Sequence, residues 1–461
     1  MTSINRQCLC GLYRHSSKGW ALLFLASWVF VMCGRDRVIA TPLVAARAPG
    51  SNATKAATRV SDLDYASLQA AVDAIAKTGG TVEISRFHEV REELTLFSNI
   101  QLLGVGGKIV FVGAHPTAHE GDQGPSRVAV NASHVKNVRL IDLDVSDGKP
   151  QAGPLVGIRL FDAVDSWIER NRLTKASMAF HSYDARKVRN LRCRDNIIDL
   201  DGVDTAGIYV SAQNGAVIDG NSVFAGHEGV GIYNGTQNAV ISRNLTLNHR
   251  PGDGIIIVDG HDLIISENVS RNNAQSGIAT QRFHTPNDVR DVNIISNIVA
   301  DNAYDGIDSN GGLAEDVPKQ SYEVNVVANH SHDNARAGLY LTHANYALLV
   351  ANRASRNGLA GVYVNNSSHV LASSNITTEN AAKEPIPAFR AGLVLYDAPH
   401  ATSTGNVSAN TGADNQLWGL VETSGDKAYN SATITGGDYA ENKRGPFNRS
   451  FHARPVRRNS H

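Results

Sequence analysis

Short apolar stretches recur along most of the chain, and each is interrupted by Asn, Gly or Asp. Typical segments are "ERNRL", "RDNII" and "DGNSV". Hydrophobic and polar residues alternate within the stretches, which predicts short β-strands, and the interrupting residues predict turns. No amphipathic segment long enough for a helix lies inside the repeated region. The pattern therefore predicts a coil of short strands.

One asparagine keeps the same place in ten successive segments. This column is Asn171, Asn196, Asn221, Asn244, Asn268, Asn297, Asn329, Asn352, Asn375 and Asn406. Its spacing has a base period near 23 residues with insertions, which is typical of a solenoid. A turn asparagine tolerates left-handed dihedral angles and can pass amide hydrogen bonds from coil to coil. We therefore assign the column to structure.

A glycine followed by an apolar residue forms a second column in phase with the first. Its members are Gly157, Gly207, Gly231, Gly254, Gly277, Gly306, Gly338, Gly361, Gly392 and Gly419. Since strand side chains alternate, the residue one past each glycine should point into the core and the residue two past it should point outward. Two columns in phase support the solenoid and define its two faces.

The region before the repeats predicts a cap for the open end of the solenoid. The segment "DYASLQAAVDAIAKTGGTVEIS" predicts an amphipathic helix from Tyr65 to Ala76, followed by a strand. The helix, "TGGTVEIS" and "ELTLFSNIQLLGVGG" resemble the entry of the pectate-lyase-like right-handed parallel β-helix proteins, over roughly Leu63 to Tyr439. The resemblance implies one all-β domain, a right-handed parallel β-helix of about ten or eleven rungs.

The N-terminal segment predicts secretion. An apolar run, Trp20 to Gly34, follows three basic residues, and Val38 to Ala40 offers a small-residue cleavage site; a membrane anchor is the alternative. We predict a signal peptide over residues 1–40, a linker over 41–62, the β-helix over 63–440 and a basic tail over 441–461. The mature protein is expected to be secreted or periplasmic, without an integral membrane segment.

Charge and cysteine content narrow the possible partners. The chain has 43 basic and 44 acidic residues, and residues 1–40 contain five basic and one acidic, which leaves 38 against 43. A mildly acidic body argues against a nucleic-acid partner. Cys193 alone remains after the signal segment, so no intrachain disulfide can form. The histidines lack a tight ligand spacing, so we expect no metal site or cofactor; the sequence does not specify a calcium requirement or the oligomeric state.

The predicted outward column is rich in tyrosine. Beginning at Arg159, it contains His181 (taking Ala179 in place of the glycine), Tyr209, Tyr233, Ile256, Ala279, Asp308, Tyr340, Tyr363, Val394 and Val421. Rungs about 4.8 Å apart match the length of one sugar residue, so these rings would offer stacking platforms to a linear glycan. His181, Tyr209, Tyr233, Tyr340 and Tyr363 are therefore predicted to bind a polysaccharide substrate. Ordinary β-propensity for tyrosine is the alternative.

Asp308 breaks the tyrosine column, and other groups that depart from the repeat lie near it in sequence. They are Arg282 and His284 in the insertion "TQRFHTPNDVR", Tyr304, Arg336 and His343. Column counting places Tyr304, Asp308, Arg336 and Tyr340 on adjacent rungs. We predict that the catalytic group lies here, with Asp308 as its acid. Asp301 and Asp305 are expected to occupy turns.

The stretch "YDGIDSN", Tyr304 to Asn310, resembles the Tyr-Gly-Phe-Asp-Pro-His-Asp motif of mannuronan C-5 epimerases in the same glycine register. Asp308 matches the first aspartate, and Tyr304 matches the tyrosine if Asp305 is an insertion. Asn310 stands where that family has its histidine and Gly311 where it has its second aspartate. The resemblance implies that another base, His284 or His343, would supply the proton transfer.

These observations favour an enzyme that abstracts the C-5 proton of a uronate in an acidic polysaccharide, as a lyase or a C-5 epimerase. An arginine, Arg336 or Arg282, would bind the uronate carboxylate through its bidentate fork. A glycoside hydrolase of polygalacturonase type is one alternative, because "AGHEGVGI" and "DGVD" faintly resemble its elements. A non-catalytic polysaccharide-binding β-helix is the other.

Overall fold

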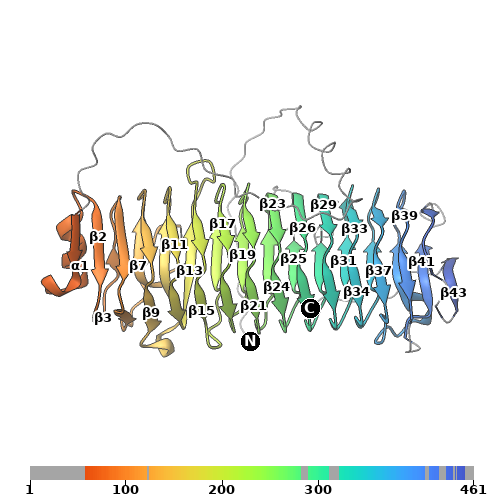
Figure 1. The fold of residues 1–461 in the computed structure, drawn as a ribbon, viewed down its shortest axis with the longest axis horizontal. Coiled ribbons are helices and arrows are strands. Elements are labelled where there is room, and N and C mark those ends of the chain that lie inside the picture. Colours follow the sequence, from red (N-terminus) through yellow and green to blue (C-terminus); the bar gives the residue numbers. More distant parts are fainter. Residues whose placement is uncertain are drawn as a thin grey trace, which may run out of the picture. The chain divides into compact units, whose positions relative to one another are not determined.

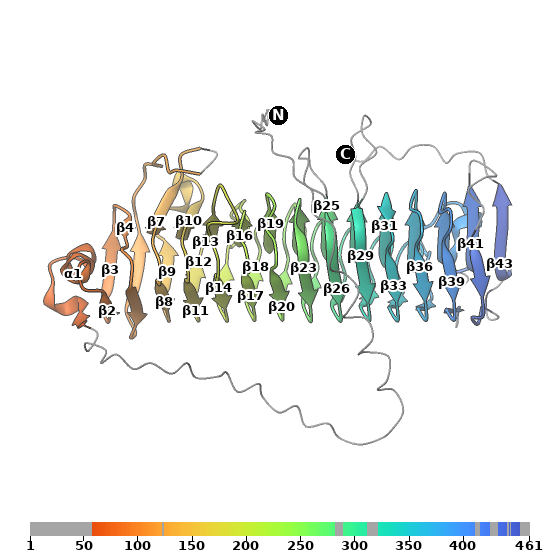
Figure 2. The same ribbon diagram turned by 90° about the horizontal axis from the view of Figure 1, so that it is seen from above.

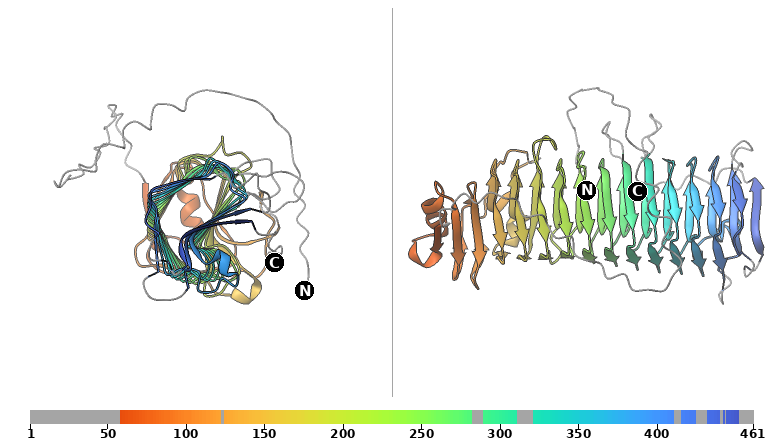
Figure 3. Two further views of the ribbon diagram at one scale, coloured as in Figure 1. Left: turned by 90° about the vertical axis from the view of Figure 1, so that its right-hand side faces the viewer. Right: turned by 45° about the horizontal axis from the view of Figure 1, so that its top comes forward.

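The computed structural model describes residues 58–121, 124–281, 289–310, 321–410, 415–424, 432–439, 442 and 444–451. These residues form three parallel β-sheets that run side by side along one axis. Within each sheet, a strand pairs with the strand one turn earlier and the strand one turn later (Figures 1 and 2). Viewed along this axis, the sheets surround a common interior (Figure 3, left). The predicted parallel β-helix is confirmed.

The first sheet, sheet A, contains 16 strands. In stacking order they are β1 (Thr58–Ser61), β2 (Gly80–Ile84), β5 (Ile100–Gly104), β8 (Arg139–Ile141), β11 (Trp167–Glu169), β14 (Arg192–Arg194), β17 (Val217–Asp219), β20 (Val240–Ser242), β23 (His261–Ser266), β26 (Arg290–Ile295), β29 (Ser321–Val327), β33 (Leu348–Val350), β36 (Leu371–Ser373), β39 (Thr402–Thr404) and β42 (Thr433–Thr435), with β32 (Ala344–Asn345) paired to β29.

Sheet B contains 13 strands and lies between sheets A and C in chain order within a turn. Its strands are β3 (Phe87–Val90), β6 (Lys108–Phe111), β9 (Asp144–Asp147), β12 (Arg172–Thr174), β15 (Ile197–Asp199), β18 (Ser222–Phe224), β21 (Leu245–Leu247), β24 (Val269–Arg271), β27 (Ile298–Ala300), β30 (His330–His332), β34 (Arg353–Ser355), β37 (Ile376–Thr378) and β40 (Val407–Ala409).

Sheet C contains 14 strands and holds the glycine column. Its strands are β4 (Leu94–Thr95), β7 (Arg127–Ser133), β10 (Leu155–Phe161), β13 (Ala176–His181), β16 (Ile208–Ser211), β19 (Val230–Tyr233), β22 (Ile255–Val258), β25 (Ile278–Gln281), β28 (Ile307–Asn310), β31 (Leu339–Thr342), β35 (Val362–Asn365), β38 (Ala391–Tyr396), β41 (Trp418–Ser424) and β43 (Gly445–Phe451).

The solenoid is longer than the ten or eleven predicted rungs. The strands from β10 to β41 of sheet C match the predicted repeats, but β4 and β7 precede them and β43 follows them. The early turns carry neither the asparagine nor the glycine column, so periodicity could not detect them. The solenoid also extends past both predicted boundaries. Strand β1 begins within residues 41–62, which were predicted to be a linker, and β43, which pairs in parallel with β41, lies within residues 441–461, which were predicted to be a tail.

The helix α1 (Leu68–Ile75) caps the first rung, as predicted, but begins three residues later than expected. The Ser67 side chain accepts a hydrogen bond from the backbone N–H of Ala70 and so fixes the start of the helix. Leu68 and Val72 lie on its buried face and join the apolar interior. Three short 3-10 segments complete the helical structure of the described residues: η1 (Asp62–Asp64), η2 (Pro150–Ala152) and η3 (Pro387–Phe389).

The predicted asparagine column is a buried hydrogen-bonded ladder. At one rung, the Asn297 side-chain amide donates to the carbonyl of Ile265 at 2.9 Å and to Oδ1 of Asn329 at 2.9 Å. The same Oδ1 accepts the backbone N–H of Asn297 at 2.9 Å. Each asparagine thus satisfies turn groups that would otherwise be buried without partners, which stabilises the turn. The structural assignment of this column is confirmed.

A second asparagine ladder, which was not predicted from the sequence, runs through the turn that precedes sheet C. Its members are Asn273, Asn302, Asn334, Asn357 and Asn380, followed by Gln416. Each side-chain amide donates to the side-chain oxygen of the next member, at 2.9 to 3.3 Å. The signal was present in "RNN", "DNA" and "RNG", but only five turns carry the asparagine. This ladder holds the turns directly before the strands of sheet C that carry the candidate site.

Candidate functional site

The outer side of sheet C carries the predicted catalytic aspartate. Ile307 lies in the apolar core, 1% exposed, so the next residue, Asp308, points to the other side of the strand. The strand register pairs Asp308 with Ala279 on one neighbouring rung and with Tyr340 on the other, and Tyr340 pairs with Tyr363. This part of the outward column is arranged as predicted.

The Asp308 carboxyl is buried without a hydrogen-bond partner. The residue is 7% exposed, and its Oδ1 atom makes no hydrogen bond. Burial, together with the nearby carboxyls of Asp305 and Asp253, raises the pKa of Asp308 well above its ordinary value, and Arg336 opposes the shift. Burial therefore disfavours the ionised form of this carboxyl, and in its neutral form it can donate a hydrogen bond.

Arg336 lies on the segment before β31, where its backbone N–H donates to the carbonyl of Tyr304 at 3.0 Å. Its guanidinium carbon lies 3.9 Å from the centroid of the Tyr304 ring and 5.5 Å from that of Tyr340. Nη1 lies 3.4 Å from Oδ2 of Asp305. The side chain is 25% exposed and makes no hydrogen bond to a described residue. The planar group is therefore held in place while its donors stay available.

Asp305 belongs to this cluster. It lies outside the strand, as expected for a turn residue, but its carboxylate accepts from the next rung and does not cap its own backbone. It is fully buried before β28, and its Oδ1 accepts the backbone N–H of Ala337 on the next rung at 2.7 Å. Burial raises the pKa of Asp305 to about 6, and Arg336 opposes the shift. Sequence could not reveal this role, because Ala337 lies 32 residues away. Asp301 does lie in an exposed turn, where Arg271 Nη2 contacts its Oδ2 at 2.6 Å.

Tyr340 and Tyr363 extend the cluster toward the C-terminal end of sheet C. Their ring centroids lie 5.6 Å apart at an angle of 45°. The Tyr340 hydroxyl accepts a hydrogen bond from Nδ2 of Asn365 at 3.2 Å, and burial raises the pKa of Tyr340. Beyond Tyr363 the column is no longer open. Val394 and Val421 are buried there with Phe389, the last residue of η3.

His181 and Tyr233 do not occupy the predicted slot of the outward column. The register pairs Ala179 with Tyr209 and Tyr209 with Gly231, so His181 and Tyr233 lie one outward position later on their strands. For Tyr233 the error arose because Gly229, and not Gly231, is in line with the glycine column. For His181 it arose because Ser177, and not Ala179, occupies the glycine position. Gly231 leaves room for the Tyr233 ring to fold back, since a Cβ atom there would lie 2.4 Å from Cε2 of Tyr233.

Despite this shift, the three rings His181, Tyr209 and Tyr233 are neighbours. The centroids of His181 and Tyr209 lie 4.9 Å apart, and those of Tyr209 and Tyr233 lie 4.7 Å apart with ring planes at 19°. This separation equals the rung spacing, so the rings stack on each other along the axis. A glycan running along the rungs would meet ring edges and hydroxyl groups more than ring faces. Their binding role remains a prediction.

Three predicted catalytic residues are not joined to this cluster. His343 lies in the turn after β31 at a φ of 53°, and its Nδ1 lies 3.0 Å from the Thr342 hydroxyl. Burial lowers the pKa of His343, and no contact within the described ranges links it to Asp308 or Arg336. Arg282 and His284 lie outside the described residues. Asp308, Arg336, Tyr304 and Tyr340 are therefore the predicted residues that the fold brings together.

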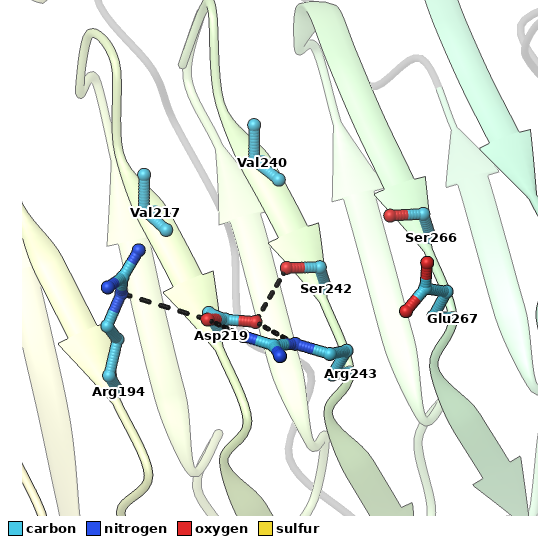
Figure 4. Close-up of a pocket in the computed structure, with 8 residues that line it drawn as sticks. All are labelled: Arg194, Val217, Asp219, Val240, Ser242, Arg243, Ser266 and Glu267. Atoms are coloured by element: carbon cyan, nitrogen blue, oxygen red, sulfur yellow. Dashed lines mark hydrogen bonds and ion pairs between the residues drawn. The ribbon is translucent and has the colours of Figure 1, made fainter. Parts of the chain in front are cut away.

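A surface pocket on sheet A is unrelated to this cluster (Figure 4). Asp219 lies at its centre, and the other lining residues include Arg194, Ser242, Arg243 and Glu267. Ser242 donates to Oδ1 of Asp219 at 2.8 Å, and Nε of Arg243 donates to the same atom at 2.9 Å. The Arg243 hydrogen bond lowers the pKa of Asp219 despite partial burial. Because its carboxylate is fully paired, we assign this pocket to surface ion pairing.

Within the part of the chain that the structure describes, no group of three or more His, Cys, Asp or Glu side chains is arranged to hold a metal ion. No helix in the same ranges is long and apolar enough to cross a membrane. The predicted signal peptide, residues 1–40, lies outside these ranges.

Comparisons with known proteins agree with the fold. The chain resembles the A-module of the mannuronan C-5 epimerase AlgE4 of Azotobacter vinelandii, with 16% sequence identity and a TM-score of 0.50, over 86% of this chain and 98% of that module. It also resembles the pre-mature gene product 12 of bacteriophage phi29, with 12% identity and a TM-score of 0.52, over 85% of this chain and 55% of that protein. At these identities the likeness concerns the fold.

The sequence itself identifies the family. No curated protein matches the chain in sequence. A family profile described as "Right handed beta helix region" matches residues 187–317 and 287–436, which together span more than half of the chain. The handedness predicted for the solenoid agrees with this match. The chain therefore belongs to the right-handed β-helix family.

Proposed function

We propose that this protein is an enzyme that modifies a uronate-containing polysaccharide by proton transfer at C-5 of the uronate. The observation that carries the proposal is the buried Asp308 carboxyl, which has no hydrogen-bond partner, near Arg336, whose side chain makes an ion pair with Asp305 but no hydrogen bond. Buried polar groups are normally satisfied, so a carboxyl without a partner near a partly exposed arginine supports a ligand that supplies the missing partner.

A uronate carboxylate fits both groups. The Arg336 guanidinium presents N–H donors in a planar fork that matches a carboxylate, and ring stacking on Tyr304 orients it. The protonated Asp308 can donate its O–H to the same carboxylate. Neutralising the carboxylate acidifies the C-5 proton, because the negative charge that develops on its removal spreads onto the carboxylate oxygens.

Proton abstraction needs a base on one face of the sugar ring, and Tyr304 is the described candidate. Its ring centroid lies 3.9 Å from the Arg336 guanidinium carbon, so a phenolate oxygen of Tyr304 would stand beside the uronate that Arg336 binds and would be placed to accept the proton. When this oxygen takes the C-5 proton, the C–H electron pair passes to the carboxylate. Return of a proton to the opposite face gives the epimer. Expulsion of the C-4 oxygen gives a C4–C5 double bond. The same residues serve an epimerase or a lyase.

The comparisons support a polysaccharide substrate, since the AlgE4 A-module, whose fold is similar, is named a mannuronan C-5 epimerase. The "YDGIDSN" motif of this chain adds a local resemblance in the same place as the cluster. Such a substrate would be met outside the cytoplasm. We therefore propose a secreted or periplasmic protein, in line with the apolar run from Trp20 to Gly34.

The test is an assay of the wild-type protein and of Asp308→Asn on a panel of uronate polysaccharides. We expect unsaturated uronate absorbance, or inversion at C-5 detected by proton NMR, and a fall of at least about a hundredfold in Asp308→Asn. Asp301→Asn is the matched control, because that carboxylate lies in an exposed turn, five residues before Gly306, and its substitution should leave activity intact. Equal activity in Asp308→Asn and wild type would remove this cluster from consideration.

A glycoside hydrolase is the second candidate, and one observation favours it. Asp305 and Asp308 lie three residues apart with raised pKa values, and carboxyl pairs in unlike environments carry out acid–base cleavage of glycosidic bonds. Release of reducing ends without unsaturation would identify this activity. Glycan binding without any product would instead favour a non-catalytic binding protein.

A further inference from the structure

The outward column that carries Asp308 is covered at its C-terminal end. The strand register continues this column from Tyr363 on β35 to Val394 on β38 and Val421 on β41. Tyr363 is partly exposed, whereas both valines are 0% exposed. Phe389, the last residue of η3, forms one apolar cluster with the two valines and is itself 4% exposed. The outer side of sheet C therefore reaches solvent at β35 and is covered one rung later.

The covering segment is tied to the rungs on either side of it. On one side, the backbone N–H of Lys383 donates to the carbonyl of Gly358 at 2.7 Å. On the other side, the carbonyl of Arg390 accepts the backbone N–H of Leu417 at 2.7 Å and that of Trp418 at 2.9 Å. Because both ends of the segment are anchored by backbone hydrogen bonds, the segment holds one position over β38.

Residues 382–389, which we call the end wall, are an insertion into this rung. The asparagine ladder spacing across the rung is 31 residues, eight more than the 23 residues of the rung before it. The residues that flank the end wall, 380–381 and 390–393, together read "NARAGL". This is also the sequence of residues 334–339, around Arg336. The repeat is therefore complete without the end wall, and insertions of this kind in solenoids often form part of the binding face.

The end wall limits how far a glycan can extend beyond the candidate site. Asp308, Tyr340 and Tyr363 lie on three successive rungs, and Val394 lies on the fourth. With rungs about 4.8 Å apart, about 10 Å separates the Asp308 rung from the Tyr363 rung, the length of about two sugar residues. A uronate bound at Asp308 can therefore be followed by about two residues before a chain along the column meets Phe389.

The opposite end of the column lies farther from Asp308. Arg159 on β10 is buried where its Nη2 donates to the carbonyl of Glu120, so the outer side is covered there as well. Strand β10 lies six rungs before β28, about 29 Å or about six sugar residues away. Three rings between these ends are partly exposed: His181, Tyr209 and Tyr233. The candidate site is thus off centre and lies close to the end wall.

We infer that the end wall makes the protein act near one end of a glycan chain, on uronates within about three residues of that end. This inference rests on the proposed function. The interior of a long chain would have to continue through the space that Phe389 and the buried valines fill, whereas a chain end needs no room beyond Tyr363. Chain ends are therefore the part of the polymer that this face accepts.

The experiment measures initial rates on polymannuronate, polygalacturonate and hyaluronan, each at two chain lengths that differ about tenfold and at equal uronate mass below KM. Unsaturated uronate absorbance and C-5 inversion by proton NMR report the rate. Action at chain ends makes the rate proportional to the number of ends, so we expect the wild-type protein to turn over the shorter chains about tenfold faster. A lyase should release first products no longer than about three residues.

Deletion of residues 382–389 tests the end wall itself. Because the remaining sequence is that of the Arg336 rung, we expect the variant to fold, as measured by circular dichroism and urea unfolding, and its length dependence to fall below about twofold. Ile386→Ala, which changes a side chain of the same segment that is 38% exposed, is the matched control and should keep the tenfold dependence. If the deletion prevents folding, Phe389→Ala, which keeps the backbone anchors, replaces it and should lower the dependence at least about twofold.

The outcomes separate the inference from the proposed function. Equal wild-type rates on long and short chains, or a folded deletion variant that keeps the tenfold dependence, would overturn the end-wall inference alone. The proposed function then stands on the unsaturated or inverted uronates that are formed. Failure of the wild-type protein to form such uronates from any polymer overturns the proposed function, and the inference with it.

Discussion

Two arginines on the outer side of sheet C behave in opposite ways, although the sequence analysis gave both a place on the same face. Arg159 on β10 is 1% exposed, and its Nη1 donates to Oδ1 of Asn131 at 3.2 Å and to the Ser133 hydroxyl at 3.0 Å. Its Nη2 donates to the backbone carbonyl of Glu120. The Arg336 side chain is partly exposed and makes no hydrogen bond to a described residue.

The difference separates structure from function. Arg159 ties the segment around Glu120 to sheet C, so its donors are used within the protein. Arg336 is oriented by two tyrosine rings and one ion pair, and its remaining donors face outward. An arginine on an outer strand face is thus no sign of a site by itself. The informative property is whether the fold satisfies its donors.

The largest expected effect is the loss of stability in Arg159→Met. Removing the guanidinium takes a donor from three oxygens. Asn131 Oδ1 keeps its hydrogen bond from the Ser133 hydroxyl, so two acceptors, the Ser133 hydroxyl and the Glu120 carbonyl, lose the donor that Arg159 supplies. At about 1–3 kcal/mol for each fully buried group, we expect a loss on the order of 3 kcal/mol. Urea unfolding followed by circular dichroism measures it. Activity per folded molecule should be unchanged, and a selective loss of activity would place Arg159 in the site.

Arg336→Lys should lower activity and leave stability unchanged. Lysine keeps the charge beside Asp305 but lacks the planar fork and the stacking on Tyr304, so we expect kcat/KM to fall about a hundredfold, equivalent to about 2.7 kcal/mol. The urea midpoint should stay near that of the wild type. Unfolding at a much lower urea concentration, with normal turnover before it, would make Arg336 a structural residue like Arg159.

Asp308→Asn should stabilise the protein while it abolishes activity. Because the folded-state pKa of Asp308 is raised, the native state keeps a proton that the unfolded state releases above about pH 4. The contribution of Asp308 to the free energy of unfolding is therefore fully present below that pH, and it is lost as the pH rises toward the folded-state pKa. The asparagine cannot ionise, so we expect a gain on the order of 1 kcal/mol at pH 8 and none at pH 4.

Unfolding midpoints of both proteins at the two pH values test this expectation. Asp253→Asn serves as a comparison, since burial also raises the pKa of Asp253 while its Oδ1 keeps a hydrogen bond that asparagine can retain. If the difference in stability between the wild type and Asp308→Asn is the same at pH 8 as at pH 4, the pKa of the buried Asp308 carboxyl is not raised.

The smallest expected effect is that of Asp301→Asn. The carboxylate and its partner Arg271 are both nearly half exposed, and exposed ion pairs contribute about 0–1 kcal/mol. We expect a change below about 1 kcal/mol in unfolding free energy and activity within twofold of the wild type. A large loss of activity would mean that the site extends to this turn.

The sequence by itself determined the fold and the location of the candidate site. The ladders depend on identical residues at equal spacing, and strand alternation depends on local backbone geometry, so both leave a periodic record in the chain. That record predicted the parallel coil, the asparagine column and the neighbourhood of Tyr304, Asp308, Arg336 and Tyr340. All four lie in rungs whose glycine register is unambiguous.

Tertiary structure alone decided which polar groups are satisfied. Two glycines two residues apart, Gly229 and Gly231, gave the sequence no means to choose a register, and only the pairing of β16 with β19 placed Tyr233. The Asp305 carboxylate is held by the backbone N–H of Ala337 on the next rung, and Arg336 keeps free donors because Asp305 meets only one of its nitrogens. Such properties depend on neighbours one turn away in space and a variable number of residues away in sequence, so no local pattern records them.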